Sequence, residues 1–506
     1  MKRTLYLETF GCQMNVLDSE LVLGQLRAQG YESTDDCGLA DVILYNTCSV
    51  REHAEQKVWS RLGRLRDRKT TDPHVVIGVI GCMAERDGVN IFKRFPHVDI
   101  LCGPGELDRL PAMVHNAVVT ATERRSDEAG PRAAGGDKGR QVALMGANVR
   151  RSSTLVAAED HLELLDLSRS VSPGDDVSQS YVRINRGCNK FCTYCVVPYT
   201  RGPEVHRPPQ NIIDEVKMLT DAGSREVTLL GQTINHYAFA HGDGRVTTFA
   251  DLLYQIHEAV PDLPRLRFVT SFPRDFTDEA LQAMRDCSRI CRYLHAPAQH
   301  GNDRILKLMN RGYTVQQYRD FLGRAREYMP DVSVASDFIV GFPTETDDEF
   351  DQTVDLVREC RFKNSFIFKY SPRPGTTAIE RFADDVPEDV KRVRNNRLLA
   401  VQQEVSEAIS REMIGHTYDV IVEGVSKFVS RGIESKIELG WEKRARFATG
   451  PETQLIGRTM GDHIVCFNGD PALKGEIVTV QIVDAKGLTL FGNLAACGVE
   501  EEAIHG

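Results

Sequence analysis

Three short apolar runs near the amino terminus, residues 5–10, 42–46 and 75–80, each end two residues before a cysteine: Cys12, Cys48 and Cys82. The runs are rich in β-branched and aromatic residues, as buried parallel strands are. Helical patterns over residues 18–29 and 52–68 separate them, and this alternation with right-handed crossovers builds one parallel sheet. We therefore expect a flavodoxin-like domain whose three thiols meet at the carboxyl edge of the sheet.

Thiols that converge in this way can hold a [4Fe–4S] cluster with one open iron. The alternative is three ordinary core cysteines. Chance would not place each of them just beyond the end of a strand, so the pattern favours the cluster.

A second group of cysteines lies in the segment GCNKFCTYC, residues 187–195, where Cys188, Cys192 and Cys195 follow the spacing C-x3-C-x2-C. Three thiolates this close can hold three irons of a cubic [4Fe–4S] cluster. Because the run has no fourth cysteine, one iron stays open for a ligand, as one position does in catalytic zinc sites. The spacing therefore indicates a catalytic cluster; a three-cysteine zinc site or chance spacing is the alternative.

The residues around both groups resemble a known enzyme family. Residues 188–208 read CNKFCTYCVVPYTRGPEVHRP, and residues 9–15 read TFGCQMN, followed by LDSE at 17–20. Both segments resemble the radical S-adenosylmethionine (SAM) methylthiotransferases, specifically the tRNA 2-methylthio-N(6)-dimethylallyladenosine synthases. Arg186 departs from the pattern, because many relatives carry Glu before the Gly-Cys pair.

The resemblance implies a transferase reaction. An external electron donor such as flavodoxin or ferredoxin reduces the cluster at residues 188–195, which cleaves SAM to methionine and a 5′-deoxyadenosyl radical. The radical removes hydrogen from C2 of N(6)-isopentenyladenosine at position 37 of tRNA, next to the anticodon. The second [4Fe–4S] cluster supplies the sulfur, which another SAM first methylates. No catalytic residue beyond the two clusters is implied, since the cofactors carry the chemistry.

The resemblance also implies which residues bind SAM, at the ends of successive strands. Taken alone, each could simply end a strand or pack the loop. They are Tyr194, Gly231, Gln232, Ser271, Gln299, Gly341 and Glu345.

Sequence patterning divides the chain into domains. Residues 1–120 form the methylthiotransferase amino-terminal domain. Residues 121–173, rich in Gly, Ser, Asp and Arg, form a linker in which residues 162–168 could dock as a short element. Residues 174–411 suit the partial (βα)6 barrel of radical SAM enzymes, with its site at the carboxyl ends of the strands. The strand candidates are residues 181–185, 226–230, 265–270, 293–296, 334–340 and 365–370.

The tail, residues 412–495, has five short strand candidates and reads as a small β-barrel. Residues 457–459 (GRT) and 464–469 (IVCFNG) resemble the TRAM domain, an RNA-binding module. Arg444, Arg446 and Arg458 are the candidates for phosphate contacts with the anticodon arm. The alternative is a structural barrel that packs on the core.

Thirteen cysteines in 506 residues are more typical of metal ligands and buried thiols in a reducing cytosol than of a disulfide framework. No apolar run reaches the roughly 18 residues of a membrane span, and the amino terminus is not a signal peptide. We therefore expect a cytoplasmic monomer with no membrane partner. The net charge of −10 argues against a generally basic RNA-binding surface. The local basic excess over residues 181–210 could meet phosphates or offset the charge of a cluster.

Two other functions compete with methylthiolation of isopentenylated adenosine. One is methylthiolation of threonylcarbamoyladenosine in tRNA or of a ribosomal protein, although those relatives tend to show other residues after the first cysteine. The other is a non-enzymatic iron–sulfur RNA-binding protein, which is hard to reconcile with two three-cysteine groups.

Overall fold

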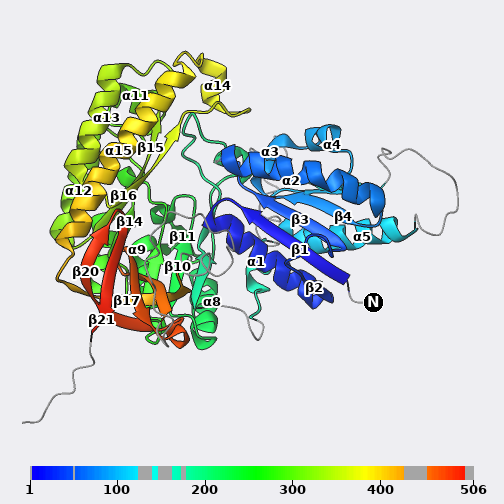
Figure 1. Cartoon of the computed structure of the whole chain (residues 1–506), viewed down its shortest axis with the longest axis horizontal. Helices are drawn as coiled ribbons and strands as arrows, with labels where there is room; N and C mark the ends of the chain where they lie inside the picture. Colours follow the sequence, from blue (N-terminus) through cyan, green and yellow to red (C-terminus); the bar gives the residue numbers. More distant parts are fainter. Residues whose placement is uncertain are drawn as a thin grey trace, which may run out of the picture.

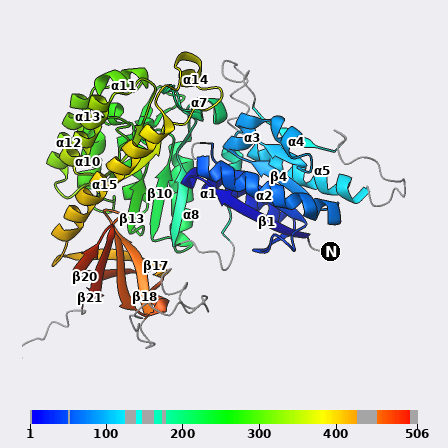
Figure 2. The same ribbon diagram turned by 45° about the horizontal axis from the view of Figure 1, so that its top comes forward.

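The computed structural model describes residues 3–49, 52–123, 139–145, 162–171, 178–426 and 453–495. Figure 1 shows three bodies: an amino-terminal α/β domain, a central barrel of strands and helices, and a small β-barrel formed by the tail. The amino-terminal domain lies beside the central barrel, and the tail lies against one end of it (Figure 2). The three bodies confirm the predicted fold classes.

The amino-terminal domain is a doubly wound sheet of parallel strands. Its strands, in spatial order, are β2 (Tyr31–Ser33), β1 (Arg3–Phe10), β3 (Val42–Thr47), β4 (Val76–Ile80), β5 (Ile100–Cys102) and β6 (Gln141–Ala143). Its helices are α1 (Gln13–Ala28), α2 (Glu52–Thr71), α3 (Cys82–Asp87), α4 (Asn90–Arg94) and α5 (Leu110–Glu123). Helices α1 and α5 share one hydrophobic core with the sheet, while α2, α3 and α4 share the other. Apolar side chains on both faces of β3 and β4 explain why these strands read as continuous apolar runs.

The central barrel contains the six predicted strands, all parallel to their neighbours. They are β7 (Gln179–Arg183), β10 (Glu226–Leu230), β13 (Arg265–Phe268), β14 (Tyr293–His295), β15 (Ser333–Val340) and β16 (Asn364–Lys369). They form two three-stranded sheets, β7-β10-β13 and β14-β15-β16, which the parallel bridge between Leu266 and Ile290 joins into one open arc.

Helices cover the outside of this arc and bury one contiguous core against it. The long ones are α8 (Pro209–Asp221), α9 (Phe249–Ala259), α10 (Asp278–Asp286), α12 (Val315–Tyr328), α13 (Asp347–Cys360) and α15 (Glu388–Glu412). Shorter elements at the strand ends are β8 (Asn185–Arg186), α7 (Val197–Thr200), β9 (Val205–His206), β11 (Ala238–Ala240), β12 (Val246–Thr248), α11 (Asp303–Leu308) and α14 (Thr377–Arg381).

The tail forms a closed five-stranded barrel in the order β17-β18-β19-β21-β20. Its strands are β17 (Thr417–Val425), β18 (Thr453–Thr459), β19 (Ile464–Gly469), β20 (Ile477–Lys486) and β21 (Thr489–Leu494). It docks on the central barrel at the amino-terminal ends of the strands. There Arg265 donates hydrogen bonds to the carbonyls of Asp419 and Arg458 at 2.7 and 2.8 Å, and Lys363 pairs with Asp462 at 2.7 Å. The tail therefore covers the end opposite to the carboxyl ends of the strands.

Parts of residues 121–173, expected to be a linker, are built into both neighbouring domains. Residues 141–143 form β6, which pairs with β5. Residues 162–167 are helical and correspond to the docking element expected at 162–168. Asp166 in this helix is buried against three arginines, Arg183, Arg186 and Arg207. Arg186 holds this helix through hydrogen bonds to Asp166 and to the carbonyl of Leu162. This role accounts for an arginine at the position where the sequence departs from the family that it resembles.

Burial of Asp166 on its own would raise the pKa of its carboxyl, but the surrounding guanidiniums outweigh burial and lower the pKa below its usual range. We expect Asp166→Asn to cost about 3–5 kcal/mol of folding stability, because it leaves three buried guanidiniums short of a counter-charge. Since the carboxylate is ionised in both folded and unfolded states above about pH 6, the loss in melting temperature stays constant from there to about pH 8.

The matched control for this prediction is Asp243→Asn, which removes an exposed carboxylate paired with Arg245 at 2.7 Å. Exposed pairs contribute little, so no measurable change is expected there. Equal shifts in the melting curves of the two variants, followed by circular dichroism, would contradict the role of Asp166.

Among the described residues, no helix combines the length and the apolar character that crossing a bilayer requires.

Candidate active site

Two groups of cysteines occupy the carboxyl ends of strands in adjacent domains. In the amino-terminal domain, Cys12 precedes α1, Cys48 follows β3 and Cys82 begins α3. The strands β1, β3 and β4 that lead to them are neighbours in the sheet. Gly11, at φ +145°, permits the close approach of the first two loops, since a Cβ there would lie 2.5 Å from Cβ of Cys48. The structure therefore brings the three thiols to one sheet edge.

Buried amides hold these loops in place. Sγ of Cys12 lies 3.1 Å from Oδ1 of Asn15, whose Nδ2 donates to Oδ1 of Asn46 at 2.8 Å. Nδ2 of Asn46 in turn donates to the carbonyl of Asn15 and to Oγ of Ser19, both at 2.9 Å. Both asparagines are fully buried. The first turn of α1 and the end of β3 are thus fixed to each other beside the thiols.

The thiols of this group have unequal electrostatic environments. A hydrogen bond with Cys48 lowers the pKa of Cys12 to about 6, and Arg201 contributes in the same direction. Burial raises the pKa of Cys82, although Arg201 opposes this through its charge and a hydrogen bond. A cation near two of the thiols favours their ionised, metal-binding form.

Polar atoms without partners flank Cys48. Oγ1 of Thr47 and Oγ of Ser49 are buried and make no hydrogen bond to any described residue. Buried polar groups are normally satisfied, so such atoms require an explanation. A polar inorganic group seated between the three loops would supply the missing partners, and the donor set of three cysteines fits an iron–sulfur cluster.

The second group lies in the loop that follows β7 and β8. Gly187 makes this loop possible: its φ is +67°, and a Cβ there would lie 1.9 Å from the carbonyl oxygen of Pro203. The loop is anchored by the backbone of Cys188, which donates to the carbonyl of Gly202 at 3.1 Å, and by Thr193, which donates to that of Met309 at 3.0 Å.

Each sulfur of this loop has at least one nearby hydrogen-bonding group. The amide of Val197 donates to Sγ of Cys195 at 3.5 Å, and Oγ1 of Thr233 lies 3.5 Å from Sγ of Cys188. Nη1 of Arg311 donates to Sγ of Cys192 at 3.3 Å. Hydrogen bonds to the sulfurs are a recognised means of tuning iron–sulfur clusters, so the donor set fits a [4Fe–4S] cluster.

Burial raises the pKa of Cys195 to about 12 and also raises the pKa of Cys188. At neutral pH these thiols ionise only with a compensating positive charge, and metal ions provide one. No group of three or more Cys, His, Asp or Glu side chains in the described ranges converges tightly enough to hold a single ion. A cubic cluster binds each thiolate to a different iron, which requires the wider spacing.

Several predicted SAM-binding residues lie at the strand ends around this loop. Gly231 follows β10, and a Cβ there would lie 1.9 Å from Oδ1 of Asn185, which needs this space. Oγ of Ser271, after β13, and Oδ1 of Asn185 are buried with no hydrogen-bond partner in the described chain. The backbone of Gln299, at φ +71°, bonds to β15. These unpartnered polar atoms beside the cysteine loop fit a polar ligand such as SAM.

The other predicted contacts offer no unpartnered polar atom of this kind among the described residues. Gln232 is partly exposed, and Tyr194 packs against the barrel core. Gly341 has φ +69°, and Glu345 bonds to His300 and Arg394, both at 3.0 Å. The carboxylate of Glu345 is thus already hydrogen-bonded by other residues of the protein. The assignment of Gly341 and Glu345 to SAM binding stays a prediction.

Of the predicted RNA contacts, Arg458 on β18 is partly buried and pairs with Glu423 at 2.7 Å and with Asp462 at 3.0 Å. Arg444 and Arg446 lie outside the described residues. The role of all three stays a prediction.

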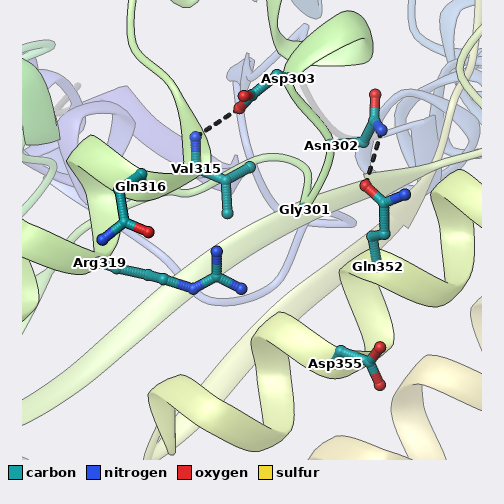
Figure 3. Close-up of a pocket in the computed structure, with 8 residues that line it drawn as sticks. All are labelled: Gly301, Asn302, Asp303, Val315, Gln316, Arg319, Gln352 and Asp355. Carbon is teal, nitrogen blue, oxygen red and sulfur yellow. Dashed lines mark hydrogen bonds between the residues drawn. The ribbon is translucent and has the colours of Figure 1, made fainter.

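A surface cavity of about 410 Å³ lies outside the barrel, between α11, α12 and α13 (Figure 3). Across it, Nδ2 of Asn302 donates to Oε1 of Gln352 at 2.8 Å, and the amide of Val315 donates to Asp303 at 2.7 Å. None of its lining residues is a cysteine or a predicted SAM contact. The cysteines and unpartnered polar atoms at the strand ends are therefore a better guide to the candidate site than the volume of this cavity.

Sequence reasoning missed several residues of the site. Arg201 and Asn15 stand inside the two segments that resemble the family, but nothing local shows that they meet. Arg311 and Thr233 have no local signal, because each reaches its cysteine across more than 40 residues of chain.

Comparison with known proteins shows what the chain as a whole is similar to. Family models match residues 4–103 (Uncharacterized protein family UPF0004), 182–357 (Radical SAM superfamily) and 447–495 (TRAM domain). A protein of Rhodopirellula baltica named tRNA-2-methylthio-N(6)-dimethylallyladenosine synthase is 44% identical over 100% of this chain and 98% of its own length. One of the same name from Porphyromonas gingivalis is 40% identical over 99% and 96%.

Among solved structures, the radical SAM methyltransferase TsrM of Kitasatospora setae, with tryptophan and a SAM analogue bound, is similar in fold. Its TM-score is 0.50 at 14% identity, covering 84% of this chain and 79% of that one.

Proposed function

This chain belongs to the family of tRNA-2-methylthio-N(6)-dimethylallyladenosine synthases, and from that membership we propose its reaction: transfer of a methylthio group to C2 of N(6)-isopentenyladenosine at position 37 of tRNA. The observation that carries the proposal is the occurrence of two three-cysteine sites at strand ends in a chain that such a relative matches from end to end. Methylthiolation of threonylcarbamoyladenosine or of a ribosomal protein is the second candidate, since it would use the same two sites.

At the barrel site, Cys188, Cys192 and Cys195 would hold a [4Fe–4S] cluster, with SAM beside it. When bound, this pair supplies the 5′-deoxyadenosyl radical that removes hydrogen from an unactivated C–H bond. The protein binds and orients them. Arg311 fixes Cys192 by donating also to the carbonyl of Pro297 at 3.0 Å. Oγ of Ser271 offers an unpartnered hydroxyl for a polar contact with SAM.

At the amino-terminal site, Cys12, Cys48 and Cys82 would hold the second [4Fe–4S] cluster, from which the sulfur comes. The support is the adjacency of their strands, the low pKa of Cys12 and the unpartnered hydroxyls beside Cys48. This site needs no hydrogen abstraction, so the two sites have separable tasks.

The remaining partners follow from this reaction. The anticodon arm of tRNA would be held in part by the TRAM barrel, and an external donor such as flavodoxin or ferredoxin would supply electrons. We propose that the chain works as a cytoplasmic monomer, since both cysteine sites are complete within one chain.

The experiment that tests this function is expression of the chain in a host that lacks its own methylthiotransferases, followed by mass spectrometry of tRNA nucleosides and ribosomal peptides. We expect 2-methylthio-N(6)-isopentenyladenosine, and none in cells that carry the Cys188→Ala variant. Methylthiolated threonylcarbamoyladenosine or a methylthiolated ribosomal peptide in its place would establish the second candidate instead.

Charge removal in the tail tests RNA binding. We expect the double variant R444Q/R446Q to weaken tRNA binding and to flatten its dependence on salt. Each lost phosphate contact reduces the slope of log K against log salt by about 0.7–0.9. Filter binding across a salt series measures both effects.

The control for the tail is Lys217→Gln on α8, which removes an exposed lysine paired with Asp221 at 3.6 Å. If the two variants bind tRNA with the same affinity and slope, the tail arginines do not contact phosphate. Point variants are preferable to truncation, because removal of the tail would expose the buried guanidiniums of Arg265 and Arg267.

A further inference from the structure

A line of alternating buried charges connects the linker helix, the central barrel and the amino-terminal domain. Asp166 pairs with Arg183 on β7, and Nη1 of Arg183 lies 2.6 Å from Oδ1 of Asp18 on α1. The other carboxylate oxygen of Asp18 lies 2.9 Å from Nη2 of Arg201, which follows α7. These four side chains are at most 7% exposed. The two domains thus share one ionic network from which water is excluded.

The last member of this network, Arg201, reaches the amino-terminal thiols. Its Nη2 lies 3.4 Å from Oδ1 of Asn15, the atom that lies 3.1 Å from Sγ of Cys12. Its charge also acts on Cys82, where it lowers the pKa of the thiol against the effect of burial; Cys82 begins α3, and α3 packs against α7. Arg201 stands only six residues after Cys195. The segment from Cys195 to Arg201 therefore contributes a ligand sulfur to the barrel site and a cation to the amino-terminal site.

We propose that Arg201, contributed by the central barrel, is a positioning residue for the amino-terminal site. Its guanidinium sets the reduction potential of the cluster there and fixes the position of the two cysteine sites relative to each other. This inference rests on the proposed function, because it needs a cluster at Cys12, Cys48 and Cys82. Net charge and hydrogen bonds to the sulfurs set the potential of iron–sulfur clusters. A buried cation beside two ligand thiolates makes that potential more positive, since reduction adds negative charge.

The guanidinium suits this role better than an ammonium would. Its Nη2 contacts the carboxylate of Asp18 and Oδ1 of Asn15 together, and a guanidinium stays charged when buried. The competing explanation is that Arg201 merely docks the two domains. Arg183 provides the comparison, because it binds the same Asp18 from the same barrel, but its other hydrogen bonds go to Asp166 and Met14 and not to Asn15 beside Cys12.

The test uses the full chain with Cys188, Cys192 and Cys195 all changed to Ala, so that only the amino-terminal cluster contributes a signal. In this background, R201Q, R201K and R183Q are reconstituted anaerobically, and iron content and midpoint potential are measured by redox titration with electron paramagnetic resonance. We expect R201Q to shift the potential to more negative values and R201K to restore part of the shift. R183Q is expected to lower the melting temperature and leave the potential in place.

In the chain with all six ligand cysteines, R201Q should lower formation of methylthiolated tRNA by about 10-fold or more, the usual cost of losing a residue that supports a metal ligand. Cleavage of SAM to 5′-deoxyadenosine should continue. An unchanged potential in R201Q, or equal effects of R201Q and R183Q on potential and iron content, would overturn the proposal. If the background chain with Arg201 intact showed no cluster signal, this would instead refute the proposed function, and this inference with it.

Discussion

Replacement of Cys188, Cys192 or Cys195 by alanine is expected to reduce 5′-deoxyadenosine formation from SAM to the background without enzyme. Each of these sulfurs is positioned by its own hydrogen-bonding group, Thr233, Arg311 or the amide of Val197. No described cysteine outside the loop is placed to substitute for one of them, and a cluster bound by two thiolates is not held in this site. Anaerobic assays with dithionite, read by liquid chromatography, measure the product.

Methyl transfer from SAM to the amino-terminal site needs no radical, so it should survive in all three variants. The matched control is Cys287→Ala, which alters a buried thiol in the core of the same barrel and should leave 5′-deoxyadenosine formation near the parent rate. Persistence of 5′-deoxyadenosine in all three loop variants would place SAM cleavage elsewhere.

The triple variant in which Cys12, Cys48 and Cys82 become Ala is expected to lose half of the iron, from about eight to about four per chain. It should still cleave SAM, because the barrel loop and its anchors at Gly202 and Met309 lie in a different domain. It should form no methylthiolated tRNA, since the sulfur source is absent. Iron assay, SAM cleavage and nucleoside mass spectrometry on one preparation give the three measurements.

A suitable control for the triple variant is Cys102→Ala. Cys102 ends β5 in the same sheet, but its thiol is buried and bonds to the carbonyl of Glu106 at 3.2 Å. Its replacement should keep the full iron content. If the triple variant also kept the full content, the amino-terminal cluster would have been wrongly assigned.

The parts of the fold that sequence predicts well are those with strong local periodicity. The strands β10, β15 and β17 lie where apolar patterning places them, because each buries at least one face. Strand β6 was missed because its three residues carry no usable pattern, and its pairing with β5 decides its conformation. Cysteines at strand ends were found because spacing is a local property.

Contacts between distant segments were beyond such reasoning. The bond between Arg183 and Asp18 joins residues 165 positions apart, and that between Arg201 and Asp18 joins residues 183 apart. Charge alone predicts that these side chains are exposed, since Arg and Asp are rarely buried unless paired. Their burial follows from the docking of two domains, which no window of sequence describes.

The position of the tail at the amino-terminal ends of the barrel strands has a consequence for which RNAs can be substrates. The reacting base must reach the carboxyl ends, and β15 alone is eight residues long, so the two ends are separated by roughly 26 Å. An RNA that touches both the tail and the cysteine loop must extend at least this far. If the tail contacts the RNA as proposed, free nucleosides and very short oligonucleotides fall below that length. The enzyme would then distinguish a folded tRNA arm from its fragments by their length, before any base is read.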